Sequence, residues 1–417
     1  MFPRGQLSRA TLRTSGVLVL RLLAQAGTLV MLANLLGATD FGIYAGIGAL
    51  AVMLGALSTF GSHVSLVRDM ARDLGCRDRV LPAALGTSLL TGLVLLCTYL
   101  VAAGSVVKST GIALWVAGFI GVAEIVVQPF ILLVSAEHQA RGHIARSQML
   151  GMMPLALRLC AVAVVWALKP MHAIEFFACG YLMASVVSLG IGLFSLPAGW
   201  PHPAQWRLLS GRAAWRDNAG FALLGLSGKG PAELDKVLAV QLLPLSLAGA
   251  YAAASRVIGA TVLPVIALML SALPRLFRAS GGGMAAPRLR YAIFASSLGY
   301  GVAASVALWA AAPAVPWLLG DPFKPAEPIL RLLALGLPGL CLRISAANIL
   351  MTTRTPWLRL FVEAVGMVLL AALALALVPH NPETGLPIAY TAAEWTMAAL
   401  AWAGVVRSAR AHHREEN

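Results

Sequence analysis

Charged residues are scarce in this chain, and acidic residues are the scarcest. Asp, Glu, Lys and Arg together make up 12% of the 417 residues, and Asp and Glu number only 17. Water-soluble domains usually carry about 25% charged residues, which keep their surfaces solvated. Because 59% of the residues are hydrophobic, the composition excludes a water-soluble globular protein and predicts an integral membrane protein.

Cysteine is also rare, and the chain has no pattern that would pair cysteines or bind a metal. The five cysteines are Cys76, Cys97, Cys160, Cys179 and Cys341. They form no CxxC motif, and the eight histidines show no metal-ligand spacing. The sequence therefore predicts no disulfide, no metal site and no cofactor.

The chain lacks a basic tail or a basic soluble segment, although its net charge is +14. Binding of nucleic acid requires basic residues gathered on one soluble face. Here they are scattered among short loops between apolar stretches. We therefore exclude nucleic acid as a partner and expect membrane lipids around the protein.

What the sequence does contain is about twelve apolar stretches of the length that crosses a bilayer as a helix. The first is too long for the apolar region of a signal peptide and is expected to stay as a helix. The stretches lie near residues 15–36, 42–62, 83–103, 112–134, 149–168, 174–196, 219–243, 247–273, 291–312, 328–348, 355–378 and 386–406.

The arginines fall on one side of these predicted spans. They lie in the segments 4–13, 68–79, 141–146, 207–216, 275–290, 354–359 and 407–414. The opposite side has only Lys108, Lys169 and Lys324. Because basic loops stay in the cytoplasm, this asymmetry predicts that both termini are cytoplasmic.

The polar stretch from Pro197 to Asp217 divides the spans into two groups of six. We expect an N-terminal lobe over 1–200, a cytoplasmic linker over 201–217 and a C-terminal lobe over 218–417. The sequence LLxxxxxGxYA occurs at 35–45 and again at 242–252. Unless the match arose by chance, the two all-α lobes are repeats related by a pseudo-two-fold axis along the membrane normal.

The same segments carry a family resemblance. Residues 35–44 and 66–72, and then 233–238, 249–258 and 273–276, resemble helices 1–2 and 7–8 of the Wzx-like polysaccharide and O-antigen flippases. These flippases belong to the multidrug/oligosaccharidyl-lipid/polysaccharide (MOP) exporter superfamily, which also contains the MATE transporters.

The resemblance implies an alternating-access transporter in the bacterial inner membrane. Its substrate would be an undecaprenyl-diphosphate-linked oligosaccharide for lipopolysaccharide, capsule or exopolysaccharide. The resemblance also implies coupling to H+ or Na+, and glycan polymerase and glycosyltransferases as partners.

Ionisable residues inside the apolar stretches are the first candidates for a site, because an unpaired charge in lipid costs several kcal/mol. Arg21 and Gln25 lie one turn apart in the first predicted helix. Lys229, Glu233 and Lys236 share a face of the seventh by their i, i+4, i+7 spacing. This placement predicts a cavity between the lobes.

Arg256 lies in the eighth predicted helix, and Asp235 lies off the shared face of the seventh. The three helices carry two more cations than acids, which would match a diphosphate. The alternative is structural: Lys229 pairs with Glu233, and Arg21 reaches the cytoplasmic interface.

Gly228, Gly230 and Pro231 surround Lys229 in the seventh predicted helix. Proline lacks an N–H and crowds the preceding turn, so the sequence predicts a kink or a break. A broken helix would present its positive end beside Lys229 as a phosphate site or hinge. An ordinary kink or a late helix start is the alternative.

Glu124, in the fourth predicted helix, is a candidate for proton exchange because burial favours the protonated carboxyl. It is equally a candidate for a structural pair with Arg158 of the fifth. Glu363 and Glu394 are weaker candidates for proton exchange, and Arg343 has no evident partner in the sequence.

Other classes of protein fit the sequence less well. A membrane glycan polymerase or ligase needs carboxylates in a sizeable external loop, and the external loops are short. A drug exporter of the same superfamily would be expected to carry an acid in the first helix, where this chain has Arg21. The loop Ser65 to Val80 lacks the signature of a major-facilitator carrier, and a scaffold remains an alternative.

Overall fold

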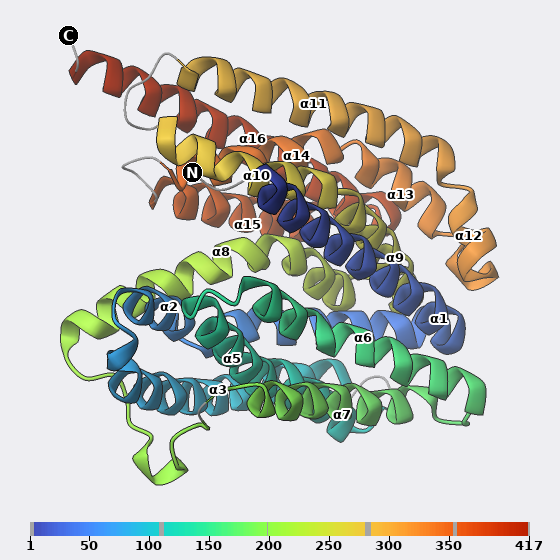
Figure 1. Cartoon of the computed structure of the whole chain (residues 1–417). Helices are drawn as coiled ribbons and strands as arrows, with labels where there is room; N and C mark the ends of the chain where they lie inside the picture. Colours follow the sequence, from blue (N-terminus) through green and yellow to red (C-terminus); the bar gives the residue numbers. More distant parts are fainter. Residues whose placement is uncertain (1–3, 108–111, 198, 280–284, 353–356, 416–417) are drawn as a thin grey trace. The chain divides into compact units, whose positions relative to one another are not determined.

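The computed structural model describes residues 4–107, 112–197, 199–279, 285–352 and 357–415. Within these ranges it describes all side chains except those of residues 4–19, 21, 273–275, 277–279, 285, 286 and 409–415. The described chain is all-helical and forms two compact units (Figure 1). Unit 1 contains residues 1–36 and 43–233, and unit 2 contains residues 37–42 and 234–417.

Unit 1 is built from seven helices and the first part of an eighth. These are α1 (Arg4–Ser58), α2 (Ser62–Arg72), α3 (Arg77–Val107), α4 (Leu114–Gly121), α5 (Gln128–Ala140), α6 (Ile144–Leu168), α7 (Ala173–Phe194) and α8 (Arg212–Leu242). A π-helical turn, Val122–Val127, joins α4 to α5. Leu66, Leu81, Phe130 and Leu133 meet in a buried core between α2, α3 and α5.

Unit 2 is built from the end of α8 and eight further helices. These are α9 (Leu245–Thr261), α10 (Leu263–Ala279), α11 (Ala285–Ala311), α12 (Ala314–Leu319), α13 (Ala326–Ala334), α14 (Leu337–Leu350), α15 (Trp357–Leu377) and α16 (Pro382–Glu415). Helix α16 packs along both α14 and α15, and α9 packs along α13. Residues 37–42, at the bend in α1, belong to this unit.

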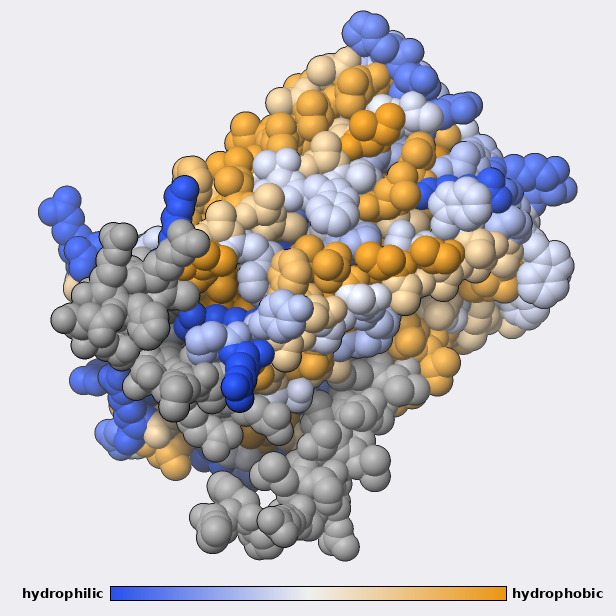
Figure 2. Space-filling model, turned by 90° about the horizontal axis from the view of Figure 1, so that it is seen from above, coloured by the Kyte–Doolittle hydropathy of each residue, from blue (hydrophilic) through white to orange (hydrophobic). Residues whose placement is uncertain are grey.

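The surface is suited to lipid. Large hydrophobic side chains are exposed in both units, including Val101, Met171, Phe194 and Trp317. Figure 2 shows hydrophobic residues over much of the visible face, with hydrophilic residues toward its margins. An exposed apolar area of this kind is stable only when lipid or another protein covers it.

The predicted fold class, an all-helical protein that crosses the membrane many times, is confirmed. In the part of the chain that the structure describes, eight helical segments are long and apolar enough to cross a membrane. A ninth is present if α13 and α14, which are bent by 49°, form one span.

This number is lower than the twelve predicted stretches, and the stretch 386–406, which forms part of α16, is among those that do not count as an apolar span. Two of the other differences have a clear cause. The first two stretches are the two helical parts of α1, which meet at Gly37, where the backbone is not helical, and together they make one of the eight segments. The stretch 219–243 lies in α8, where Lys229, Glu233, Asp235 and Lys236 make one segment too polar for an apolar span.

The polar segment after α7 packs against unit 1. The backbone N–H of Arg207 donates to Pro82 O (3.2 Å), and that of Leu209 donates to Thr87 Oγ1 (3.1 Å). Helix α8 begins in the same unit, where Ser65 Oγ donates to Asn218 Oδ1 (2.9 Å). The division into lobes at 201–217 stays a prediction, since the compact units meet within α8, at residues 233 and 234.

Candidate functional site

The structure distributes the predicted cationic residues over both units. Lys229 and Glu233 lie in unit 1, and Lys236 and Arg256 lie in unit 2. Gln25 is half-buried in α1, whereas the side chain of Arg21 lies outside the described residues. That these groups face one cavity therefore stays a prediction.

A buried ion pair joins α6 to the π-helical turn in unit 1. Arg158 Nη1 lies 2.7 Å from Glu124 Oε1, and Glu124 is 6% exposed. Tyr181 OH donates to the same carboxylate oxygen (2.6 Å), and Arg158 Nη2 donates to Ser185 Oγ (2.9 Å). The guanidinium also stacks 3.7 Å above the centre of the Tyr181 ring. Each charge is thus neutralised and hydrogen-bonded, as burial requires.

The π-helical turn brings Glu124 to this position. A π turn widens the helix and redirects some backbone carbonyls away from their usual partners. Ser58 Oγ donates to Ile125 O (2.5 Å). A side chain at Gly55 would meet the carbonyl oxygen of Glu124 at 2.5 Å, so α1 approaches the turn closely because residue 55 is glycine.

Lys229 is exposed on α8 and adds a positive charge near the Glu124 pair. It interacts electrostatically with both Glu124 and His63. Glu233, one turn further along α8, is half-buried. An exposed lysine beside a neutralised pair is available to an anionic ligand, as Lys is a compact point charge on a flexible stem.

In unit 2 the end of α8 carries a second buried pair. Asp235 is 1% exposed, and its Oδ1 lies 3.2 Å from Lys236 Nζ. Ser255 Oγ and Tyr251 OH, both from α9, donate to Asp235 Oδ2 at 2.8 and 3.2 Å. These bonds fix α8 against α9 within unit 2. Lys236 is therefore already held by its neighbour, which weakens its case as a ligand group.

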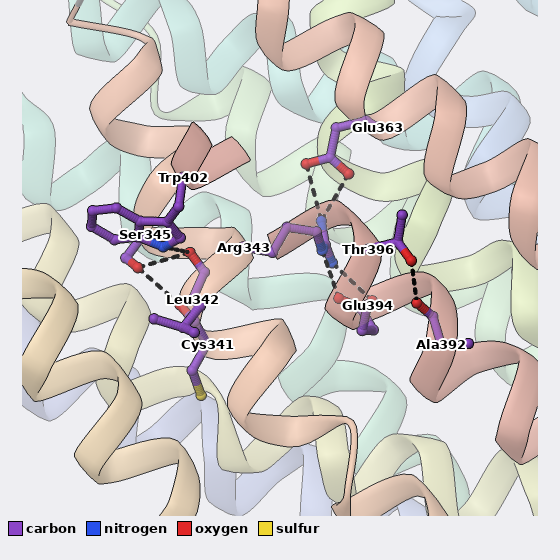
Figure 3. Close-up of polar contacts among 9 residues, drawn as sticks. All are labelled: Cys341, Leu342, Arg343, Ser345, Glu363, Ala392, Glu394, Thr396 and Trp402. Atoms are coloured by element: carbon purple, nitrogen blue, oxygen red, sulfur yellow. Dashed lines mark hydrogen bonds and ion pairs between the residues drawn. The ribbon is translucent and has the colours of Figure 1, made fainter. Parts of the chain in front are cut away.

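Arg343, which had no evident partner in the sequence, pairs with two acids in the structure (Figure 3). Arg343 Nε lies 2.7 Å from Glu394 Oε2, and Nη1 lies 2.8 Å from Glu363 Oε2. All three residues are at most 6% exposed. A side chain at Gly339, one turn before Arg343, would contact the backbone of Glu394 at 3.2 Å, so this glycine lets α14 approach α16.

Arg256 of α9 lies against an aromatic ring of the same unit. Its guanidinium carbon is 5.6 Å from the centre of the Phe41 ring. Phe41 is fully buried and also contacts Phe323 edge-on, with the ring centres 5.9 Å apart. Arginine stacks on aromatic faces and can still direct its N–H groups elsewhere.

The short segment 37–42 reaches α9 through two glycines. Gly37 has φ 69° and ψ 176°, a conformation that in practice only glycine adopts. A side chain at Gly42 would lie 2.7 Å from the backbone nitrogen of Gly249. A side chain at Gly249 would overlap the carbonyl oxygen of Ala38. The two backbones therefore touch directly at Gly42 and Gly249.

The predicted break in α8 is not observed. The helix runs from Arg212 to Leu242 through Gly228, Gly230 and Pro231. No helix end is therefore presented beside Lys229. A hinge role for these residues stays a prediction, and the unit boundary falls just after Pro231.

Within the described residues no three His, Cys, Asp or Glu side chains are grouped to hold a metal ion. The buried charges instead pair with one another, joining α6 with the π turn and α14 with α15 and α16. The apolar helices and the buried ion pairs are those of a multi-pass membrane protein.

Solved structures share this fold. An inward-facing multidrug resistance MATE transporter of the MOP superfamily has a TM-score of 0.73 at 15% identity, covering 94% of this chain and 95% of its own. The lipid II flippase MurJ has a TM-score of 0.69 at 13% identity, covering 94% and 86%. A MOP superfamily transporter from Pyrococcus furiosus has a TM-score of 0.66 at 16% identity, covering 97% and 94%.

The family follows from the sequence itself. Residues 8–280 match the model of the family described as Polysaccharide biosynthesis protein, so the chain belongs to that family. This confirms the resemblance drawn from the motifs around residues 35–44 and 249–258. A search of curated proteins found no match.

We expect Glu124→Gln to lower the free energy of unfolding by about 1–3 kcal/mol, because a charge-assisted bond to Arg158 becomes a neutral one. Glu175→Gln, at an acid in the first turn of α7, is the control and should change little. Thermal unfolding of the purified protein measures both. If Glu124 instead exchanges a proton during transport, the variant keeps its stability and loses transport. A stable and fully active Glu124→Gln protein would contradict both roles.

Proposed function

We propose that this protein is a flippase that moves an undecaprenyl-diphosphate-linked oligosaccharide across the bacterial inner membrane. The family match over residues 8–280 carries the proposal, because that family is described by polysaccharide biosynthesis. The fold is shared with transporters, which supports movement of a substrate across the membrane. One structural neighbour, MurJ, is itself a lipid II flippase. Both termini lie in the cytoplasm in this proposal, as the arginine-rich loops predict.

The cations of α1, α8 and α9 support an anionic substrate. Lys229 is exposed, and Arg256 is half-buried against Phe41. In a helix at membrane depth such groups are costly unless water or an anion meets them. We propose that Arg21, Lys229 and Arg256 bind the diphosphate, with Gln25 hydrogen-bonding nearby and Lys236 contributing less because Asp235 holds it.

The alternative within the superfamily is export of a drug-like molecule, since the structural neighbours include multidrug MATE transporters. Those neighbours are only 13–17% identical to this chain and so speak for the fold alone. The two functions can be separated by measuring which ligand the purified protein binds. A flippase should bind a polyprenyl-linked glycan, and a drug exporter should bind organic cations.

We expect Arg21→Gln, Lys229→Gln and Arg256→Gln each to reduce surface glycan severalfold in a host that lacks its own flippase, with lipid-linked precursor accumulating on the cytoplasmic face. Arg256→Lys should lose part of the activity, since it keeps the charge but loses the planar fork. Lys324→Gln, at an exposed loop lysine, is the control. Well-expressed variants that all restore normal surface glycan would disprove the cationic site.

A further inference from the structure

Unit 1 contains a cleft that the ion pairs above do not occupy. It has a volume of about 470 Å³ and opens between α2, α5 and α6. Helix α2 contributes His63 and Arg68, α5 contributes Gln139, and α6 contributes Gln148 and Gly151. The volume is within the range of small-molecule sites, which is about 300–1,000 Å³.

The walls of the cleft are held by hydrogen bonds. Ser135 Oγ of α5 lies 2.7 Å from Ser147 O and 2.9 Å from Ser147 Oγ of α6. Thr59 Oγ1 lies 2.8 Å from His63 Nδ1, which fixes the imidazole ring and leaves Nε2 for another partner. Side chains positioned in this way need little reordering when a ligand binds.

Neutral hydrogen-bonding groups dominate the chemistry of the cleft. The side chains of Gln139 and Gln148 are exposed, and no described protein group holds either amide. Each amide offers two donors and an acceptor, the combination that matches a hydroxyl group. Val67, Leu132 and Met152 add apolar surface beside them, which suits the C–H faces of a sugar ring.

The cleft is a poor match for phosphate. Arg68 is the one Lys or Arg among the lining residues, and two carboxylates offset its charge, with Nε 2.8 Å from Asp69 Oδ1 and Nη1 4.0 Å from Asp217 Oδ2. The cations proposed to bind the diphosphate lie on other helices, α1, α8 and α9. A ligand with a charged end and a neutral polyhydroxyl end would therefore place its charged end at these cations and its polyhydroxyl end in the cleft.

We propose that the cleft between α2, α5 and α6 binds the sugar end of the substrate, separately from its diphosphate. This assignment rests on the proposed flippase function and makes the glycan a recognised part of the substrate. The arginine-rich segments 68–79 and 141–146 adjoin the cleft and predict that it opens to the cytoplasm. The cleft would thus select the glycan before translocation.

Gly151 allows the cleft to be filled without disturbing the helix. A Cβ atom there meets nothing within 4 Å. Gly151→Phe should block the site, and Gly190→Phe in α7, where a Cβ atom is also unobstructed, is the matched control. Gln139→Ala combined with Gln148→Ala removes the hydrogen bonds and leaves the space open.

The measurement is the affinity of the purified full chain for two lipids, a polyprenyl-diphosphate oligosaccharide and the same polyprenyl diphosphate without sugar. We expect Gly151→Phe and the double variant to bind the glycosylated lipid about tenfold more weakly or worse, and the sugar-free lipid as the wild type does. Lys229→Gln should weaken both. Unchanged binding of the glycosylated lipid by both cleft variants would overturn the assignment, with the flippase function intact. A wild-type protein that binds neither lipid would overturn the flippase function and the assignment together.

Discussion

Replacing Arg343 with methionine is expected to lower the free energy of unfolding by about 3–5 kcal/mol, because two buried carboxylates then lose the guanidinium that pairs with both of them. Glu363 and Glu394 are each 2% exposed, and both accept hydrogen bonds from this guanidinium. Thermal unfolding in detergent, followed by size-exclusion chromatography, measures the loss.

Two comparisons show whether the loss comes from the unpaired charges. Changing Glu363 and Glu394 to leucine together with Arg343→Met removes all three charges and should recover most of the stability, since an apolar replacement of a buried ion cluster is often neutral. Arg331→Met is the matched control: this arginine pairs with Glu327 at 2.9 Å but is 37% exposed, so the change should cost at most about 1 kcal/mol. Equal losses for Arg343→Met and Arg331→Met would show that burial of the cluster contributes nothing.

The second large effect is expected at Gly249. In Gly249→Leu the new Cβ atom overlaps the carbonyl oxygen of Ala38, and a backbone atom cannot rotate away as a side chain can. Overpacking of this kind typically costs about 1–3 kcal/mol, and more where the backbone must move. We expect the segment 37–42 to leave α9, with loss of transport and a lower unfolding temperature.

Gly259→Leu is the control for this prediction. It lies on the same helix, α9, it is exposed, and a Cβ atom there meets nothing within 4 Å. Gly37→Ala should also destabilise the protein, through backbone strain, since its φ of 69° with ψ of 176° is closed to alanine. Normal stability and transport in Gly249→Leu would mean that the contact between 37–42 and α9 is dispensable.

Much of the fold could be predicted from hydropathy, because lipid demands apolar helices of a nearly fixed length. The predicted stretches all lie in helical parts of the chain, but some cover two helices, as 247–273 covers α9 and α10, and some ends differ by about ten residues. Hydropathy also predicts an interruption between residues 36 and 42, and the backbone of α1 leaves the helical conformation at Gly37. Hydropathy could not show that α8 continues through Pro231, because the effect of proline depends on what packs around it.

The site was less predictable, because charge pairing depends on which helices are neighbours. Glu124 and Arg158 could be suggested as a pair from adjacent helices, and the structure places them 2.7 Å apart. The partners of Arg343 come from α15 and α16, and nothing in the sequence orients three helices around one residue. The sequence showed only that Arg343, Glu363 and Glu394 lie in apolar stretches, where buried charges of opposite sign are expected to neutralise one another.

The contact of Gly42 with Gly249 also bears on the order in which the protein can be completed during synthesis. Residues 37–42 leave the ribosome about two hundred residues before α9, which at about 5–20 residues per second means tens of seconds. During that time the bend in α1 has no partner, although the helices on both sides of it are already made. Residues 37–42 can therefore pack only after α9 has been synthesised. A nascent chain that stops before α9 would leave the Gly37 bend exposed to proteases and chaperones of the membrane.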